Sequence, residues 1–176
     1  MRGMQKHVIR PAEPSDIQDM VQLHKEYRLQ TYQGFPALQD QKEADCWGKN
    51  IQEWLQTPQM RVFVLLVDGA MRAITAYRLQ EAEAGMQKSE GEIVSLEILP
   101  GTPTQFSGAL VSYILKDLAG MGSKKVRVWL LRDNLRSRYG YEQLGFKADG
   151  SICQVTTCGE DFCMTRYVYQ IPDKVG

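Results

Sequence analysis

The chain has 176 residues and a mass of 20.0 kDa, a length that predicts one domain over residues 1–176 with a full hydrophobic core. Hydrophobic residues make up 43% and charged residues 24%, which excludes wholesale disorder, a collagen-like repeat and a disulfide miniprotein. Lys and Arg number 21, as do Asp and Glu, so the net charge is zero. This balance argues against a nucleic-acid partner held by phosphate contacts. No apolar run approaches the roughly 20 residues of a membrane span, so we expect no membrane partner.

The four cysteines bear on compartment and metal content. The stretch Met1–His7 has no apolar core of a secretory signal, so reduced thiols and a cytoplasmic location are expected. Cys153, Cys158 and Cys163 follow a C-x4-C-x4-C spacing that lacks the usual C-x2-C knuckle and has no histidine nearby. The pattern predicts half-buried cysteines on a β-hairpin and no metal, and Cys46 belongs to a predicted helix.

Hydrophobic periodicity predicts the order strand, two helices, three strands, helix, strand, helix and two strands. Ser15 and Gln18 form a capping-box pair at the start of the first helix. Asp68 and Gly69 are typical of a two-residue hairpin turn. The predicted strands cover 7–10, 62–67, 70–79, 92–99, 125–131, 152–157 and 163–171; the predicted helices run from Ser15 up to Tyr32, from Asp40 to Thr57, from Thr104 to Gly120 and from Asn134 to Leu144.

This order predicts an α+β (mixed α/β) fold, with a twisted and mostly antiparallel sheet of about seven strands flanked by about four helices. One β-α-β crossover joins the strand at 92–99 to the strand at 125–131. Such a crossover brings a helix N-terminus beside the carboxyl end of a strand. The unbonded N–H groups and the positive dipole of that helix end can hold a phosphate.

Three segments carry a resemblance to a known family. Ile9–Ile17 is similar to a first strand with its turn into helix one, and Glu92–Pro100 to a fourth strand. In Asn134–Phe146 an Asn begins a helix and Tyr-Glu-x-x-Gly-Phe closes it. In this order the segments resemble the GNAT-type N-acetyltransferases over nearly the whole chain. The resemblance implies a GNAT-like domain that uses acetyl-CoA as co-substrate, needs no metal, and acetylates a primary amine.

The resemblance also implies a cofactor site at the crossover. The family's acyl-CoA loop usually reads Arg/Gln-x-x-Gly-x-Gly/Ala, whereas here Gln105 and Ser107 stand at glycine positions and no basic residue is present. The pyrophosphate loop is therefore degenerate, because glycines there let the backbone approach the pyrophosphate closely. Main-chain amides from Phe106 onward are expected to surround the diphosphate. The implied cofactor-binding residues are Ile98, through its main chain, and Thr104, Gln105, Phe106, Ser107, Gly108, Asn134, Arg136 and Ser137.

Two catalytic residues follow from the resemblance and from position. Tyr141 matches the family tyrosine that can protonate the departing thiolate, and Tyr139 is its local competitor. Glu97 is the first choice for the general base, since it interrupts an apolar strand beside the implied oxyanion donor. Glu92 is the alternative base, and strand alternation puts it on the opposite face unless a bulge intervenes. A glutamate that faces solvent at a sheet edge is the structural alternative for Glu97.

For several side chains the sequence allows either a contact with the cofactor or a purely structural role. Arg136 and Arg138 are hypothesised to meet the phosphates of coenzyme A, with ordinary surface charge as the alternative. Asn134 either hydrogen-bonds the cofactor or caps its helix.

His7 and His24 are the only histidines, and both are interpreted as structural. Tyr32, Phe35 and Trp47 are candidates for an aromatic acceptor pocket, although Trp47 is favoured as a core residue.

The acceptor itself is left open as a small-molecule or peptide amine. The alternative to an enzyme is a non-catalytic, degenerate GNAT-like module that acts as an acyl-CoA sensor or a protein-interaction domain. A homodimer through an exposed sheet edge is a further option.

Overall fold

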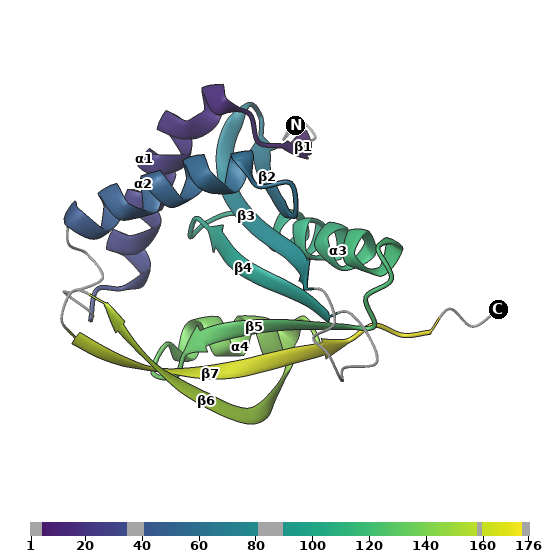
Figure 1. The fold of residues 1–176 in the computed structure, drawn as a ribbon. Helices are drawn as coiled ribbons and strands as arrows, with labels where there is room; N and C mark the ends of the chain where they lie inside the picture. Colours follow the sequence, from purple (N-terminus) through teal and green to yellow (C-terminus); the bar gives the residue numbers. More distant parts are fainter. Residues whose placement is uncertain (1–4, 35–40, 81–89, 158–159, 174–176) are drawn as a thin grey trace. The chain divides into compact units, whose positions relative to one another are not determined.

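The computed structural model describes residues 5–34, 41–80, 90–157 and 160–173, without the side chains of residues 41–45, 157 and 160 (Figure 1). The chain divides into two compact units. The N-terminal unit comprises Met1–Ala76 and Ser95–Leu110, and the C-terminal unit comprises Tyr77–Val94 and Val111–Gly176. That residues 1–176 form a single domain stays a prediction.

The described strands are β1 His7–Pro11, β2 Met60–Val67, β3 Ala70–Gln80, β4 Glu90–Ile98, β5 Lys125–Leu131, β6 Lys147–Thr157 and β7 Glu160–Gln170; the α-helices are α1 Ile17–Thr31, α2 Gln41–Gln56, α3 Thr104–Gly120 and α4 Leu135–Gln143. The strands form a sheet in the order β1-β2-β3-β4-β5-β7-β6. β4 and β5 pair in parallel through Gly91, Glu92 and Ile93, and α3 connects them. The pairs β1–β2, β5–β7 and β6–β7 are antiparallel. The predicted α+β class, the seven strands and the β-α-β crossover are confirmed.

The start of α1 differs from the prediction. A 3-10 turn, Pro14–Asp16, precedes the helix, and the capping box is formed by Glu13 and Asp16. The N–H of Glu13 donates to Oδ2 of Asp16 at 2.8 Å. The predicted Ser15–Gln18 pair is wrong because Pro14, which needs no N–H partner and has a helical φ, moves the first turn upstream.

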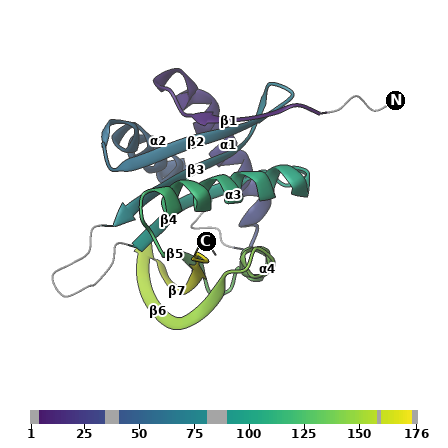
Figure 2. The same ribbon diagram turned by 90° about the vertical axis from the view of Figure 1, so that its right-hand side faces the viewer.

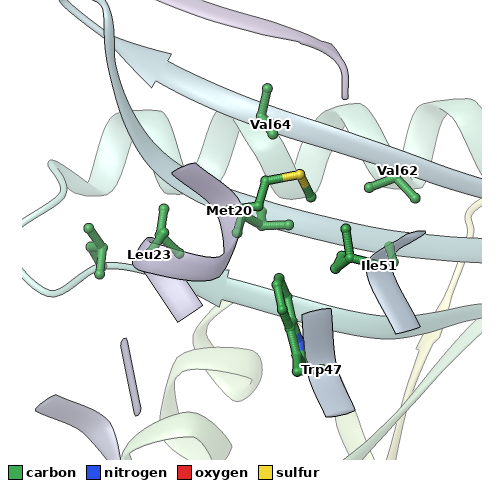
Figure 3. Close-up of a cluster of buried hydrophobic side chains, with 9 residues drawn as sticks. Met20, Leu23, Trp47, Ile51, Val62 and Val64 are labelled. Carbon is green, nitrogen blue, oxygen red and sulfur yellow. The ribbon is translucent and has the colours of Figure 1, made fainter. Parts of the chain in front are cut away.

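The N-terminal unit packs α1 and α2 against β2 and β3. Met20 and Leu23 of α1 meet Trp47 and Ile51 of α2 over the valines of β2 (Figure 3). These positions recur at helical spacing, so each helix buries one apolar stripe. The buried cluster comprises Met20, Leu23, Trp47, Ile51, Val62, Val64, Ile74, Ala76 and Leu99. Trp47 is thus confirmed as a core residue.

The first three strands lie side by side (Figure 2). Asp68 and Gly69 both have positive φ, 50° and 84°, which is the backbone of the predicted hairpin turn between β2 and β3. β1 continues one residue beyond its predicted end, because Pro11 pairs with Phe63 at the edge of the sheet, where a proline costs no ladder bond.

The C-terminal unit is built on β5, β7 and β6, with α4 and the second half of α3. The O–H of Tyr77, fully buried on β3, donates to Asp117 of α3 at 2.7 Å. β6 begins at Lys147, earlier than predicted, because the register shifts between Ala148 and Ile152 and the turn-like residues there form an irregularity within the strand. None of the helices in the described part of the chain is long and apolar enough to cross a membrane.

Candidate active site

The predicted site residues are divided between the two units. Glu97, Ile98 and residues 104–108 belong to the N-terminal unit, on β4 and on the first turns of α3. Residues 134–141 belong to the C-terminal unit, around α4.

Glu97 is a buried carboxylate near the end of β4. It is 7% exposed, so the solvent-facing alternative is wrong. Oε1 of Glu97 lies 2.7 Å from Nδ1 of His24, which is itself 3% exposed. Oε2 is also buried, and no residue in the described part of the chain donates a hydrogen bond to it. A carboxylate oxygen removed from water without a donor is energetically costly, which marks this atom as one that needs a further partner.

Two buried residues of α1, His24 and Arg28, extend the cluster that begins at Glu97. Nη1 of Arg28, 4% exposed, lies 3.4 Å from Nε2 of His24. The imidazole also stacks on Trp47 of α2, with ring centroids 4.1 Å apart and planes 9° from parallel. Sequence reasoning missed this cluster as a site and left His24 as structural. The available signal was the spacing of His24 and Arg28, two polar residues four apart on the apolar face of a helix.

Tyr32, which caps the C-terminus of α1, is half-buried close to the same carboxylate. Burial raises the pKa of the Tyr32 phenol, and the negative charge of Glu97 raises it further. Its ring meets Tyr27 edge to face, with centroids 5.9 Å apart. Phe35, the other aromatic predicted for an acceptor pocket, lies outside the described residues.

Glu92 is engaged elsewhere. Its Oε2 accepts hydrogen bonds from Nε of Arg78 and from Nε2 of Gln80, both at 2.9 Å. Within the C-terminal unit this carboxylate is therefore held by neighbouring strands, and the geometry favours Glu97 as the candidate base.

The loop after β4 has a basic partner that its own sequence lacks. Nη2 of Arg72 donates to the carbonyl of Pro100 at 3.1 Å, and its Nε donates to Oγ1 of Thr102 at 3.3 Å. The Thr102 hydroxyl in turn donates to the carbonyl of Leu99 at 2.7 Å. Gly101 adopts a positive φ of 82°, which favours glycine. Arg72 comes from β3, 28 residues before Pro100, so no local pattern could have indicated it.

In the first turn of α3, some of the main-chain N–H groups that were expected to bind the diphosphate instead form hydrogen bonds within the chain. The N–H groups of Phe106 and Ser107 donate to the carbonyl of Pro103 at 2.9 and 3.3 Å. The expectation that amides from Phe106 onward face a diphosphate is therefore corrected. The N–H groups of Thr104 and Gln105 precede the helical ladder and have no carbonyl of the helix to bond.

Side-chain exposure separates the members of this segment. Thr104 and Gln105 are exposed, whereas Ile98, Ser107 and Gly108 are half-buried. Phe106 is 4% exposed and packs its ring 4.9 Å from that of His7, so its side chain belongs to the core.

In the C-terminal unit, Tyr141 is the buried tyrosine of α4. It is 9% exposed and meets Phe146 edge to face at 5.1 Å, whereas Tyr139 is 64% exposed. Oδ1 of Asn134 accepts the N–H of Ser137 at 3.1 Å, which confirms the helix-capping interpretation of Asn134.

The two arginines of α4 differ. Nε of Arg138 donates to the hydroxyl of Tyr167 at 3.0 Å, and its Nη1 donates to the carbonyl of Arg132 at 2.9 Å. Tyr167 in turn donates to Oε1 of Glu142 at 2.8 Å. Arg138 therefore fastens α4 to β7, while Arg136 is exposed.

The cysteines carry free thiols at Cys46, Cys153 and Cys163. The last two are half-buried on the β6–β7 hairpin, as predicted, and Cys158 lies outside the described residues. Over residues 5–34, 41–80, 90–157 and 160–173, no group of three or more His, Cys, Asp or Glu side chains is arranged to hold a metal ion.

Solved structures of acetyltransferases share this fold. NAA60 of Arabidopsis thaliana, solved with a bisubstrate analogue, matches with a TM-score of 0.72 and 13% identity over 94% of this chain and 98% of its own. The Salmonella typhimurium acetyl transferase that modifies the N-terminal serine of ribosomal protein L7/L12 matches with a TM-score of 0.73 and 14% identity, over 94% and 95%. PaiA N-acetyltransferase of Thermoplasma acidophilum, solved with coenzyme A, matches with a TM-score of 0.69 and 17% identity, over 93% and 99%.

No family model matches the sequence, and no curated protein matches it. At these identities the likeness concerns the backbone. The chain has the fold of the GNAT N-acetyltransferases.

Proposed function

We propose that this protein is an acetyl-CoA-dependent N-acetyltransferase that transfers the acetyl group directly to a primary amine of a small molecule or peptide. The observation that carries the proposal is the buried Oε2 of Glu97, which lacks a donor among the described residues on a strand that leads into α3. Solved structures with this fold hold acetyl-CoA or coenzyme A, as in YncA of Salmonella typhimurium and in PaiA.

The residues of the N-terminal unit suit an acyl-CoA diphosphate. The amides of Thr104 and Gln105 open α3, where N–H groups and the helix dipole favour an anion. Arg72 brings a positive charge to the loop before them. In this proposal, the amides of Thr104 and Gln105 and the guanidinium of Arg72 bind the diphosphate, in place of the amides from Phe106 onward.

In the proposed reaction, Oε2 of Glu97 takes a proton from the acceptor ammonium and leaves a neutral amine. The amine nitrogen then forms a bond with the thioester carbonyl carbon, and the main-chain N–H of Ile98 stabilises the oxyanion. As the intermediate collapses, the carbon–sulfur bond breaks and the nitrogen, positively charged after the attack, gives its second proton to water. The departing thiolate takes a proton from water. The role of acid that the resemblance implies for Tyr141 stays a prediction, because Tyr141 belongs to the C-terminal unit.

The experiment joins a binding measurement to a turnover measurement. Acetyl-CoA should raise the melting temperature, because a ligand at about a hundred times its Kd adds roughly 2.7 kcal/mol to the native state. Thiol release should appear with at least one member of a panel of amines and peptide N-termini. Glu97→Gln should lower kcat by about a hundredfold, the usual scale for a lost general base, without changing the thermal shift.

Exposed Glu26 on α1 offers a matched control, since Glu26→Gln removes one carboxylate from the exposed side of the helix that carries His24 and Arg28. Its turnover should equal that of the parent. The proposal fails if acetyl-CoA does not stabilise the protein, or if no member of the amine panel gives thiol release.

A second candidate is an acyl-CoA sensor without turnover. The internal use of the Phe106 and Ser107 amides, together with non-glycine residues at 105 and 107, favours it. Stabilisation by acetyl-CoA with no thiol release over the whole amine panel would select the sensor. A protein that acetyl-CoA does not stabilise would instead fit an interaction domain.

A further inference from the structure

We infer that Arg28, His24 and Glu97 form a buried hydrogen-bonded relay in which His24 positions the carboxylate of the proposed base. The inference rests on the proposed function. His24 links the other two residues, with Nδ1 2.7 Å from Oε1 of Glu97 and Nε2 3.4 Å from Nη1 of Arg28. All three residues are at most 7% exposed.

The two hydrogen bonds of His24 determine which of its ring nitrogens carries the proton. A guanidinium only donates, so Nε2 of His24 must be the acceptor of the Arg28 hydrogen bond. A neutral imidazole carries its single proton on the other nitrogen. Nδ1 of His24 therefore carries the proton and donates to Oε1 of Glu97. Protonation of Nε2 would aim a second N–H at the guanidinium, so the contact with Arg28 selects the neutral Nδ1–H tautomer.

The ring is fixed in orientation as well as in tautomer. Trp47 covers one face of the imidazole at 4.1 Å, almost parallel to it. A rotation about the ring axis would break both hydrogen bonds at once. His24 therefore holds Oε1 of Glu97 in one place.

This arrangement has a consequence for proton transfer. With Oε1 occupied by His24, Oε2 is the carboxylate oxygen that remains available, and it is buried without a donor in the described part of the chain. A base whose accepting atom is already oriented needs no reorganisation when the acceptor amine arrives. His24 is a positioning residue, since it acts on the reaction through Glu97.

Two substitutions of His24 separate positioning from the mere filling of space. In His24→Asn the amide nitrogen stands close to the place of Nδ1 and can still donate to Oε1, whereas His24→Leu fills a similar volume and donates nothing. His24→Leu should lower kcat about as much as Glu97→Gln, roughly a hundredfold, with KM for acetyl-CoA unchanged. His24→Asn should recover most of kcat.

The double variant tests whether the two residues act together. The kcat of the double variant, His24→Leu with Glu97→Gln, should equal that of Glu97→Gln alone. His24 acts only through the carboxylate of Glu97, so its loss has no further effect once that carboxylate is gone. Parental turnover in His24→Leu, equal loss in the Leu and Asn variants, or multiplicative losses in the double variant would each overturn the inference.

A spectroscopic measurement on the native protein tests the relay without any turnover. The chain has two histidines, so a long-range proton–nitrogen NMR spectrum of the native protein holds two imidazole patterns, which His7→Asn assigns. His24 should show the Nδ1–H tautomer at neutral pH, and Arg28→Met should mix in the Nε2–H tautomer. A dominant Nε2–H tautomer or a doubly protonated ring in the parent would overturn the relay. An inactive parent that still shows the Nδ1–H tautomer would refute the proposed function and leave the relay standing.

Discussion

Asp16 receives both arms of the Arg10 guanidinium, with Nη1 of Arg10 2.7 Å from Oδ2 and Nη2 2.8 Å from Oδ1. The same carboxylate accepts the N–H of Glu13, so one side chain joins β1 to the capped start of α1. The hydrogen bonds from Arg10 lower the pKa of Asp16, while its burial acts in the opposite direction. The position beside a helix N-terminus also favours a negative charge.

Asp16→Asn should lower the free energy of unfolding at pH 7 by about 1–2 kcal/mol, because it removes the anion and disturbs the cap. The folded pKa of Asp16 lies below the ordinary value of 3.8, so its stabilisation is present above that pH and is lost as the pH falls through the folded pKa. Urea unfolding should therefore show the parent and the variant converging below about pH 4. Asp19→Asn, on the exposed side of the first turn of α1, is the control. A gap that stays constant down to acid pH would contradict the argument.

Gly91 occupies a site on β4 with no room for a side chain. An added Cβ would stand 2.8 Å from Cδ1 of Leu118 and 3.2 Å from Cγ2 of Val126. Gly91→Ala should destabilise the protein by about 1–3 kcal/mol through overpacking, measured as a lower urea midpoint. Gly120→Ala is the matched control, because nothing lies within 4 Å of its Cβ, and it should be neutral or slightly stabilising. Equal urea midpoints for the two variants would contradict this prediction, because they would mean that Leu118 moves to accommodate the extra methyl group at no cost.

Arg72 should contribute to acetyl-CoA binding if the proposed function holds. Arg72→Ala removes two hydrogen bonds to the loop after β4 and one positive charge, so calorimetry should show about a tenfold weaker Kd. Lys49→Ala, which removes an exposed positive charge from α2, should leave Kd unchanged. An Arg72→Ala protein that is folded and binds acetyl-CoA like the parent would remove Arg72 from the site.

Tyr32 should report the charge of Glu97 without any assay of activity. Because its pKa is raised, Tyr32 should ionise above the ordinary value of 10.0, seen as the difference between ultraviolet titrations of the parent and Tyr32→Phe. In Glu97→Gln the pKa of Tyr32 should fall but stay raised, since burial is the larger cause. The contribution of Tyr32 to stability is complete below pH 10.0 and is lost as the pH rises through its folded pKa. A Tyr32 titration that is identical in Glu97→Gln would place the carboxylate charge elsewhere.

The order of the elements and the fold class were readable from the sequence, because periodicity and turn chemistry are local properties of the chain. The hairpin at Asp68 and Gly69 follows from residues that tolerate a positive φ, and the cap of α4 from an Asn with a helix behind it. Trp47 was recognised as core from the apolar stripe of its helix. Two element ends differ from the prediction. A local 3-10 turn at Pro14 moves the start of α1, and pairing with β7 through an irregular register moves the start of β6.

Only the tertiary structure decided which polar groups meet. Glu97 was a candidate base from its place in an apolar strand, but its partner His24 lies 73 residues away on a helix. Arg72 reaches the loop after β4 from another strand. The choice between Glu92 and Glu97 depends on the partner of each, since Glu92 binds Arg78 of the neighbouring strand and Glu97 binds His24 of a helix. A pattern in sequence records which face of an element is apolar. The partner of a buried charge is set by packing between elements, and that packing depends on the whole chain at once.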